Sequence, residues 1–271
     1  INVGSFSEER AVIEFTNVSK VYANGTNALK DINLKIDKGE FVFIVGSSGA
    51  GKSTLFNAIL GKFLPDKGSI LLDGEDITYE KDYKRALNIG CLYQNPMRGT
   101  APNMTIEENL ALAYTRKSTH RFFAVNKKDS AYFRELLASL DLGLEDRMKT
   151  KMGLLSGGQR QAAALLMATI AKPKLLLLDE HTAALDPATA EKVLRITRSI
   201  ISERGLTALM ITHNMEQALA FGNRTIMMDS GRLVLDVRDE ERAAMTPQKL
   251  VELFSRSARQ ALSDRTQLSV S

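Results

Sequence analysis

Residues 41–54 have the sequence FVFIVGSSGAGKST, in which an apolar run passes directly into a glycine-rich turn. The five uninterrupted apolar residues at its start are typical of a strand covered on both faces of a sheet. The pattern after the turn predicts a helix from about Lys52 to Leu60, ended by Gly61. The segment therefore predicts a buried strand, a tight loop and a helix in immediate succession.

The turn fits the pattern G-x-x-x-x-G-K-[ST]. Glycines permit a close backbone approach, so successive N–H groups and the N-terminus of the next helix can bind the phosphates of a nucleotide. Lys52 adds a positive charge, and the Ser53 hydroxyl is placed to bind Mg²⁺. A chance match is the alternative, but the strand before the turn and the helix after it favour a phosphate loop. The predicted nucleotide-binding residues of this loop are Gly46, Ser47, Ser48, Gly49, Ala50, Gly51, Lys52, Ser53 and Thr54.

Strand patterns recur on both sides of a helical middle region. Helical periodicity runs from Thr105 to Met148, where Thr105 and Glu108 form a capping-box pattern, and the helical region is expected to end near Lys172. Strands that alternate with helices indicate an α/β domain with a largely parallel sheet. The other predicted strands cover residues 11–15, 32–36, 70–72, 89–92, 175–178, 207–211, 225–228 and 232–235, and helices cover residues 187–202 and 247–262.

Composition and charge limit the classes of protein to which this chain can belong. The 271 residues are 44% hydrophobic, enough for a sizeable core without disulfides, and the single Cys91 suits a reducing compartment. The 36 Lys and Arg are nearly balanced by 32 Asp and Glu, which argues against a nucleic-acid partner. No stretch reaches the roughly 20 apolar residues that span a bilayer, and residues 1–10 lack the apolar core of a signal peptide. We therefore expect a soluble, cytoplasmic protein.

Two acids follow the apolar run 175–178, and a histidine follows the run 207–211. Ligands of parallel α/β sheets bind where such strands end. Asp179 is therefore expected to hold Mg²⁺, and Glu180 to act as general base toward the attacking water. His213 is a candidate γ-phosphate contact that also orients Glu180. Solvated acids at a strand end and a structural histidine are the alternatives.

Residues 155–159 have the sequence LSGGQ and precede a predicted helix from Arg160. With the phosphate loop, this segment makes the chain resemble the nucleotide-binding subunit of an ATP-binding cassette (ABC) transporter. Hydroxyl and N–H groups at a helix start can hold phosphate. The resemblance implies that this segment contacts the nucleotide of a second copy, so that two chains pack head to tail around two ATP molecules. The residues implied in this contact are Leu155, Ser156, Gly157, Gly158 and Gln159.

The same resemblance implies roles for further residues. Tyr22 matches the aromatic residue that stacks on adenine, Gln94 matches the glutamine that senses Mg²⁺ and the water, and Asp186 matches a loop that crosses the dimer interface. Asp179 and Glu180 match the metal-binding and catalytic acids, and His213 the switch histidine. The sequence departs from the family at residues 181–183, which are HTA where PTS is usual, and at Asn214, where Asp is common.

The resemblance also implies the architecture. An ABC ATPase is an α/β P-loop ATPase with a mixed sheet flanked by helices, an antiparallel β-subdomain and an inserted helical subdomain. We expect the ATPase domain over residues 11–254, with the core and β-subdomain in residues 11–93 and 173–240 and the helical subdomain in residues 95–172. Residues 255–271 are expected to form the end of the last helix and a polar tail.

The subfamily resemblance is divided. Residues 94–96, 179–187 and 246–254 resemble importer ATPases associated with lipoprotein substrate-binding proteins, whereas residues 18–55 resemble the bacterial cell-division ABC ATPase. The first hypothesis is a peripheral subunit at the cytoplasmic face of a bacterial membrane, which imports a small solute such as an amino acid with permease subunits and a substrate-binding protein. Residues 94–103 are then the expected docking site for the permease, with Met97, Arg98 and Met104 as contacts. The second hypothesis is a cell-division ATPase that signals to a membrane partner without transport.

Overall fold

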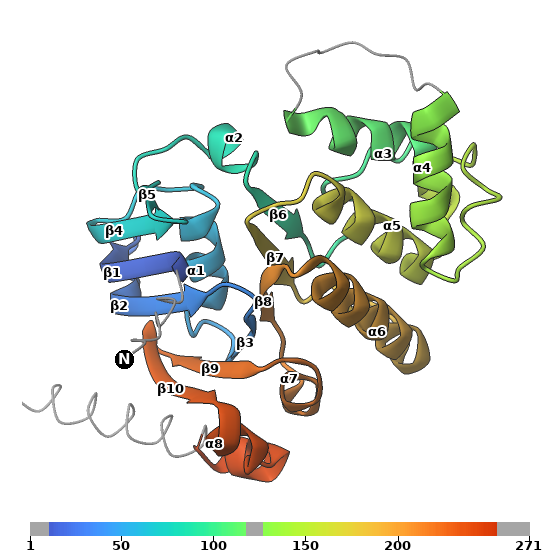
Figure 1. The fold of residues 1–271 in the computed structure, drawn as a ribbon. Helices are drawn as coiled ribbons and strands as arrows, with labels where there is room; N and C mark the ends of the chain where they lie inside the picture. The colour runs from blue at the N-terminus through green and yellow to red at the C-terminus, as the bar shows by residue number, and fades with distance from the viewer. Residues whose placement is uncertain (1–10, 118–126, 254–271) are drawn as a thin grey trace, which may run out of the picture.

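The computed structural model describes residues 11–117 and 127–253. Its core is a six-stranded sheet (Figure 1), built from β3 (Phe41–Val45), β6 (Ile89–Leu92), β7 (Leu175–Asp179), β8 (Thr207–Ile211), β9 (Arg224–Asp229) and β10 (Arg232–Arg238). The strand order is β10-β9-β3-β8-β7-β6, and β10 alone runs antiparallel to its neighbour. β3 and β8 are buried at every residue, as their unbroken apolar sequences predict.

A second, antiparallel sheet has the order β2-β1-β4-β5. It consists of β1 (Ala11–Val21), β2 (Asn27–Asp37), β4 (Lys67–Leu72) and β5 (Glu75–Asp76). β1 and β2 are 11 residues each and so much longer than predicted. The reason is a bulge: the register of β1 shifts between Phe15 and Val18, and Asn17 has a positive φ of 51°. The bulge interrupts the alternation of apolar residues while the strand continues.

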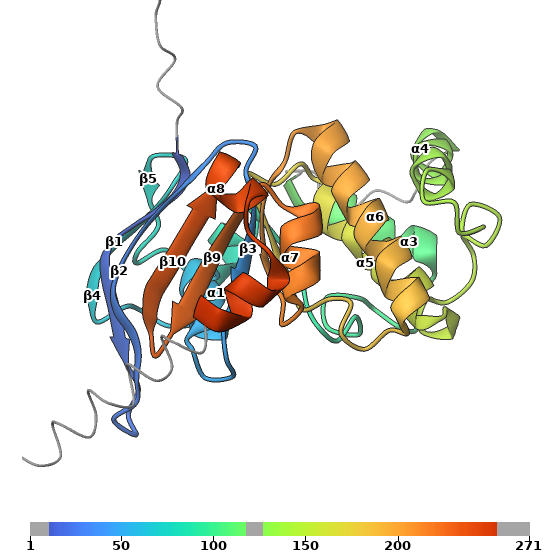
Figure 2. The ribbon, with the colours of Figure 1, turned by 90° about the horizontal axis from the view of Figure 1, so that it is seen from below.

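Helix α1 (Lys52–Ile59) lies between the two sheets, and the remaining long helices cover the opposite face of the larger sheet (Figures 1 and 2). Alternate residues of β3 point to opposite faces, so Val42 and Ile44 join the core around α1 while Phe41 and Phe43 join the core of the helical side. The helices of that side are α3 (Ile106–Tyr114), α4 (Lys127–Ala138), α5 (Gly157–Ile170), α6 (Pro187–Arg204) and α7 (Met215–Phe221). Each sheet face therefore has its own hydrophobic core.

The helical region differs from its prediction in detail. The capping box at Thr105 and Glu108 is confirmed at the start of α3. The predicted helicity up to Met148 is wrong, because α4 ends at Ala138 and turns follow, with Asp141 at a φ of 53°. The signature helix α5 begins at Gly157 rather than Arg160. Short elements that the sequence did not predict are α2 (Asp82–Arg85), α8 (Asp239–Ala243) and two 3-10 turns, Thr115–Lys117 and Met152–Leu154.

The last predicted helix begins at Pro247 as expected and continues to residue 253, where the described residues end. The rest of the predicted range, to residue 262, lies outside them. Within the ranges that the structure describes, no helix is both long and apolar enough to cross a membrane.

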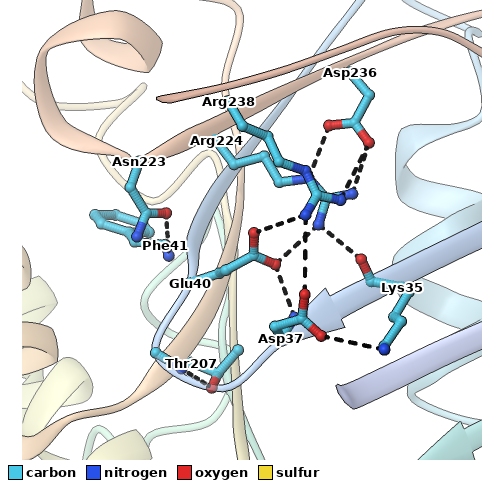
Figure 3. A network of polar contacts seen from close by, with 10 residues as sticks. Lys35, Asp37, Glu40, Phe41, Thr207, Asn223, Arg224, Asp236 and Arg238 are labelled. Carbon is cyan, nitrogen blue, oxygen red and sulfur yellow. Dashed lines mark hydrogen bonds and ion pairs between the residues drawn. The ribbon is translucent and has the colours of Figure 1, made fainter. Parts of the chain in front are cut away.

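A buried guanidinium joins the two sheets (Figure 3). Arg224, the first residue of β9, donates to both carboxylate oxygens of Asp236 on β10 at 2.8 and 2.6 Å. It also donates to Glu40 Oε2 at 2.9 Å and to the carbonyl oxygen of Lys35, on β2, at 2.7 Å. The guanidinium thus fixes the larger sheet to β2 of the smaller one at the point where the chain enters β3.

Replacing Arg224 by Met should lower the free energy of unfolding by about 3 kcal/mol, because two carboxylates would face each other without their buried cation. Urea denaturation measures this change. Arg238→Met is the control: the Arg238 side chain is 41% exposed and lies 3.6 Å from both Glu40 and Asp236 and 3.9 Å from Asp37, so its loss should cost less than about 1 kcal/mol. Equal losses of unfolding free energy in the two variants would contradict the conclusion that Arg224 is the main cation of this network.

The same network predicts a dependence on pH. Burial alone would raise the pKa of Asp236, but hydrogen bonds and charge from Arg224 outweigh it and hold the pKa below its usual range. A carboxylate with a depressed pKa loses its stabilising contribution as the pH falls through that pKa. The stability difference between the wild type and Arg224→Met should therefore shrink below about pH 4, near the ordinary pKa of Asp.

Candidate nucleotide-binding site

The phosphate loop, residues 46–54, connects β3 to α1 and lies against neighbouring backbone. A Cβ atom added to Gly46 would come within 2.2 Å of the Met228 carbonyl oxygen, and one added to Gly51 within 2.6 Å of the Ala28 carbonyl oxygen. Both glycines also have positive φ angles, 148° and 107°. A side chain at either position would clash with backbone, so the glycines let the loop curl tightly enough to present its N–H groups.

Lys52 is buried at the start of α1, where its Nζ donates to the carbonyl oxygens of Gly46 and Ser47, both at 2.8 Å. Burial lowers the pKa of Lys52, and the nearby charges of Glu180 and Asp179 oppose this shift. The structure therefore brings the phosphate-loop lysine and the two predicted acids into one electrostatic group.

Tyr22 lies beside the loop and Ser53 within it, and both residues are exposed. The Tyr22 hydroxyl is 3.3 Å from Thr54 Oγ1, and its ring meets Phe63 edge-on at 5.9 Å between centroids. Tyr22 thus presents an aromatic ring next to the phosphate loop, where an adenine base would need one. Its assignment to adenine stays a prediction.

Asp179 is the last residue of β7 and Glu180 follows it at the carboxyl edge of the sheet. Burial raises the pKa of Asp179, as does the charge of Glu180, while Lys52 opposes both. Glu180 has a left-handed φ of 45°, and its N–H donates to the carbonyl oxygen of Ile211 at 3.1 Å. The backbone is therefore held in a disfavoured conformation by pairing to β8.

His213 meets Glu180 directly: Nε2 is 2.6 Å from Oε1 of Glu180. The Glu180 side chain is only 17% exposed, whereas that of His213 is 54% exposed. Asn214 begins α7, and its Oδ1 accepts from the N–H of Gln217 at 2.9 Å. The departure from Asp at this position thus keeps a helix cap, since Asn caps helices as well as Asp does.

Gln94 is exposed two residues after β6 ends, and β6 pairs with β7 in parallel. It therefore lies at the same sheet edge as Asp179. A hydroxyl at Ser53, a carboxylate at Asp179 and an amide oxygen at Gln94 are oxygen donors of the kind that Mg²⁺ prefers. The described residues contain no group of three or more His, Cys, Asp or Glu that could hold a metal by themselves. Mg²⁺ would therefore depend on phosphate oxygens and water for its remaining ligands.

The signature loop, residues 155–159, starts α5 in the helical region. Leu155 is buried, and Ser156 caps the helix by accepting from the N–H of Gln159 at 3.3 Å. A Cβ atom on Gly158 would lie 2.4 Å from Thr189 Cγ2, so a larger residue here would require Thr189 on α6 to shift. The exposed Ser156 and Gly157 belong to a different part of the fold from the phosphate loop.

Asp186 has a structural role that the sequence reasoning did not assign. It is exposed and caps α6, where its Oδ1 accepts from the N–H of Thr189 at 3.0 Å. The hydrogen bonds from Thr189 hold the pKa of Asp186 below its usual range. An acid followed by proline is a helix-start signal that the sequence contained.

The imidazole of His181 takes no part in the candidate site. His181 is 1% exposed, its Nε2 is 3.1 Å from Thr197 Oγ1, and burial lowers its pKa to about 3. It is therefore a neutral core residue. His120 lies outside the described residues.

Residues 29–183 match the protein family described as ABC transporter. The chain belongs to the ABC transporter family. Its ABC ATPase fold and its ATP-hydrolysing activity follow from that membership, and both confirm the resemblance read from the phosphate and signature loops. Individual relatives narrow the type of ABC protein to which this chain belongs.

Two relatives of known type are similar over most of their length. The tyrosine transport ATP-binding protein of Clostridioides difficile (strain R20291) is 40% identical over 247 residues, which cover 90% of this chain and 98% of that protein. The phosphonates import ATP-binding protein PhnC of Lactobacillus gasseri is 39% identical over 238 residues, covering 85% and 89%. The chain is thus an ATP-binding subunit of an ABC transporter with importer-type relatives.

Solved structures agree with the fold. The cassette cbiO1 from Clostridium perfringens, part of the ABC transporter complex cbiONQ, has a TM-score of 0.76 and 26% identity, and the match covers 97% of this chain and all of cbiO1. The dimeric cassette MJ0796 bound to ADP and phosphate has a TM-score of 0.71 and 32% identity, with 83% and 98% covered. One protein of this fold, MJ0796, therefore binds ADP and phosphate as a dimer.

Replacing Lys52 by Ala should weaken ATP binding about 10- to 100-fold, because one charge-assisted contact to phosphate is worth about 1.5 to 3 kcal/mol. Fluorescence titration with a labelled ATP analogue measures the dissociation constant. Lys192→Ala, an exposed lysine of α6 paired with Asp141, is the control and should bind as the wild type does. Unchanged affinity in Lys52→Ala would contradict the phosphate-loop assignment.

Proposed function

We propose that this chain is the energy-coupling ATPase of an importer for a small solute such as an amino acid, and that it works as a head-to-tail dimer on membrane permease subunits. The observation that carries the proposal is the 2.6 Å contact between Glu180 and His213 at the sheet edge that also holds Lys52 and Asp179. The names of two relatives, one for tyrosine transport and one for phosphonate import, support an importer of small polar solutes.

In this proposal the phosphate loop binds the triphosphate through its N–H groups, and Lys52 leaves its loop carbonyls to contact the β- and γ-phosphates. Ser53, Asp179 and Gln94 would hold Mg²⁺, which neutralises charge on the transferred phosphoryl group. Tyr22 would stack on adenine. These residues position the nucleotide with its γ-phosphate toward the carboxyl edge of β7.

Glu180 is the proposed general base. A proton on His213 Nε2, donated to Oε1, would hold the carboxylate in one orientation, so that the carboxylate can accept a proton from the attacking water. The water oxygen then bonds to the γ-phosphorus while the bond to the bridging oxygen of ADP breaks. The low exposure of Glu180 supports this role, because it keeps bulk water away from the carboxylate and the reacting phosphate.

The site is completed by a second copy in this proposal. Ser156 and Gly157 lie exposed at the N-terminus of α5, where N–H groups can bind phosphate, yet they belong to the helical region. A head-to-tail dimer would bring them to the γ-phosphate bound by the other chain, with Asp186 at the interface. The dimeric relative bound to ADP and phosphate supports this arrangement.

The proposed permease site is a groove of about 460 Å³ between the core and the helical region, called here the docking groove. Its floor is apolar, with Cys91 on β6 and Met167 and Ala168 on α5, and exposed Leu112 of α3 lies on its rim. Of the three contacts expected from the sequence, Arg98 lines the groove and stacks over Tyr93 at 5.8 Å. An apolar floor with a polar rim suits a short amphipathic helix of a membrane subunit.

In this proposal the chain works at the cytoplasmic face of the membrane, and a substrate-binding protein would meet the permease on the other side. The second candidate, a cell-division ATPase without cargo, rests on the sequence of residues 18–55. Copurification separates the two hypotheses, because a many-span permease supports transport and a partner with few spans and a large extracellular loop supports the division role.

Glu180→Gln should bind ATP yet hydrolyse it at least about 100-fold more slowly, because the general base is lost. The stalled dimer should appear as a doubling of mass in light scattering with ATP. Adding Ser156→Arg to this variant should abolish the doubling while each monomer still binds ATP, since the bulky side chain would occupy the phosphate-binding helix start. Hydrolysis at the wild-type rate in Glu180→Gln would exclude Glu180 as the base.

Leu112→Glu should reduce copurification of the membrane partner by about 10-fold or more, because a charge would replace an apolar side chain of the docking groove. ATP hydrolysis by the isolated subunit should stay unchanged, since Leu112 is 56% exposed and remote in sequence from the phosphate loop. Val234→Glu, on β10 and 40% exposed, is the matched control. Equal recovery of the partner with both variants would contradict the docking assignment.

A further inference from the structure

Gln161 on α5 joins two loops of the candidate site. It is 1% exposed, and its Nε2 donates to the carbonyl oxygen of His181 at 2.5 Å and to that of Tyr93 at 3.4 Å. His181 directly follows Glu180, and Tyr93 directly precedes Gln94. One side-chain amide thus contacts the chain next to the proposed base and next to the proposed Mg²⁺-sensing glutamine.

The stability of the fold does not explain well why residue 161 has an amide side chain. Gln161 Oε1 is buried and has no hydrogen-bond partner among the residues that the structure describes, and the same holds for the neighbouring His181 Nδ1. An unsatisfied buried polar atom costs about 1 to 3 kcal/mol, which offsets most of what the two donated bonds contribute. The clear effect of Gln161 is therefore geometric, because it fixes the positions of two backbone carbonyls.

The loop after β7 needs such support. Glu180 has a left-handed φ, which is strained for a residue with a long side chain. Within the loop, the N–H of Ala183 donates to the Glu180 carbonyl oxygen at 2.9 Å, and the bond from Gln161 to His181 is an anchor from outside it. Without that anchor, the peptide after Glu180 can relax and move the carboxylate away from His213.

The neighbouring residue Arg160 connects the same helix to the signature loop. Its guanidinium donates to the carbonyl oxygens of Gly153 and Leu155 at 2.9 and 2.8 Å, and it contacts the sulfur of Met97 at 3.4 Å. Consecutive residues of α5 therefore hold the loop before Ser156 and the loop after Glu180. A displacement of α5 moves both loops together.

We propose that Gln161 is a positioning residue for hydrolysis, which ties the orientation of Glu180 and the residue before Gln94 to the place of α5. The helical region, which would carry the permease and the signature loop, thereby sets the geometry of the general base. This inference rests on the proposed role of Glu180. Gln161 contacts no part of the phosphate loop among the described bonds, so its influence falls on the chemical step rather than on ATP affinity.

Gln161→Met tests the proposal, because it keeps the length and removes the donor. We expect kcat for ATP hydrolysis to fall about 10- to 100-fold while the dissociation constant for ATP changes less than about twofold. Thr169→Val is the matched control: Thr169 is also fully buried on α5, but its hydroxyl donates to Leu165 within the helix and accepts from Arg204 of α6 at 3.2 Å, so it contacts neither loop. It should lower Tm by a similar amount and leave kcat unchanged.

Wild-type kcat in Gln161→Met would overturn the proposal, as would equal losses of kcat in Gln161→Met and Thr169→Val. If Gln161→Met does not fold, Gln161→Asn keeps the amide one methylene short of both carbonyls and should show the same loss of kcat with ATP affinity retained. Glu180→Gln, measured in parallel, separates a failure of the proposed general base from a failure of the proposed positioning role of Gln161. ATP hydrolysis by Glu180→Gln at the wild-type rate would contradict the assignment of Glu180 as the base. An inactive Glu180→Gln together with a fully active Gln161→Met would contradict the positioning role of Gln161 alone.

Discussion

The arrangement of the whole molecule depends on the buried guanidinium of Arg224. A cation removed from water requires carboxylates and carbonyls on several sides, and these come from the end of β2, the turn before β3 and the middle of β10. These contacts hold the antiparallel sheet at a set distance from the parallel one. Helix α1 fills the space between them, and the phosphate loop leads from β3 into that helix.

Parallel pairing then determines which residues meet. Because β3, β6, β7 and β8 all end at one edge, the phosphate loop, Gln94, Glu180 and His213 lie there although well over a hundred residues separate the first from the last. Strand pairing does not set the position of the signature loop, because this loop starts α5, a helix that packs in the other hydrophobic core. One chain therefore carries its two predicted phosphate-binding loops in separate parts of the fold, which is why a pair of chains makes a complete site in the proposed function.

Local chemistry explains which parts the sequence could predict. The buried strands, the phosphate loop and the capping box at Thr105 depend on neighbouring residues, and the structure has them as expected. The bulge at Asn17 and the end of α4 at Ala138 were missed because a positive φ in Asn or Asp leaves little trace in the sequence. Arg224 and Gln161 were missed for another reason. Their partners lie far away in the chain, and a buried Arg or Gln in sequence looks the same as an exposed one.

The strained backbone at Glu180 affects which substitutions this protein can accept at that position. A φ of 45° suits glycine or asparagine better than glutamate, so the fold would gain stability from replacing the residue proposed as the general base. Thermal selection and catalytic selection then act in opposite directions at this one position. A variant library screened only for heat resistance would be enriched in folded, nucleotide-binding and inactive chains, and the enrichment would measure how much strain the fold retains for the sake of turnover.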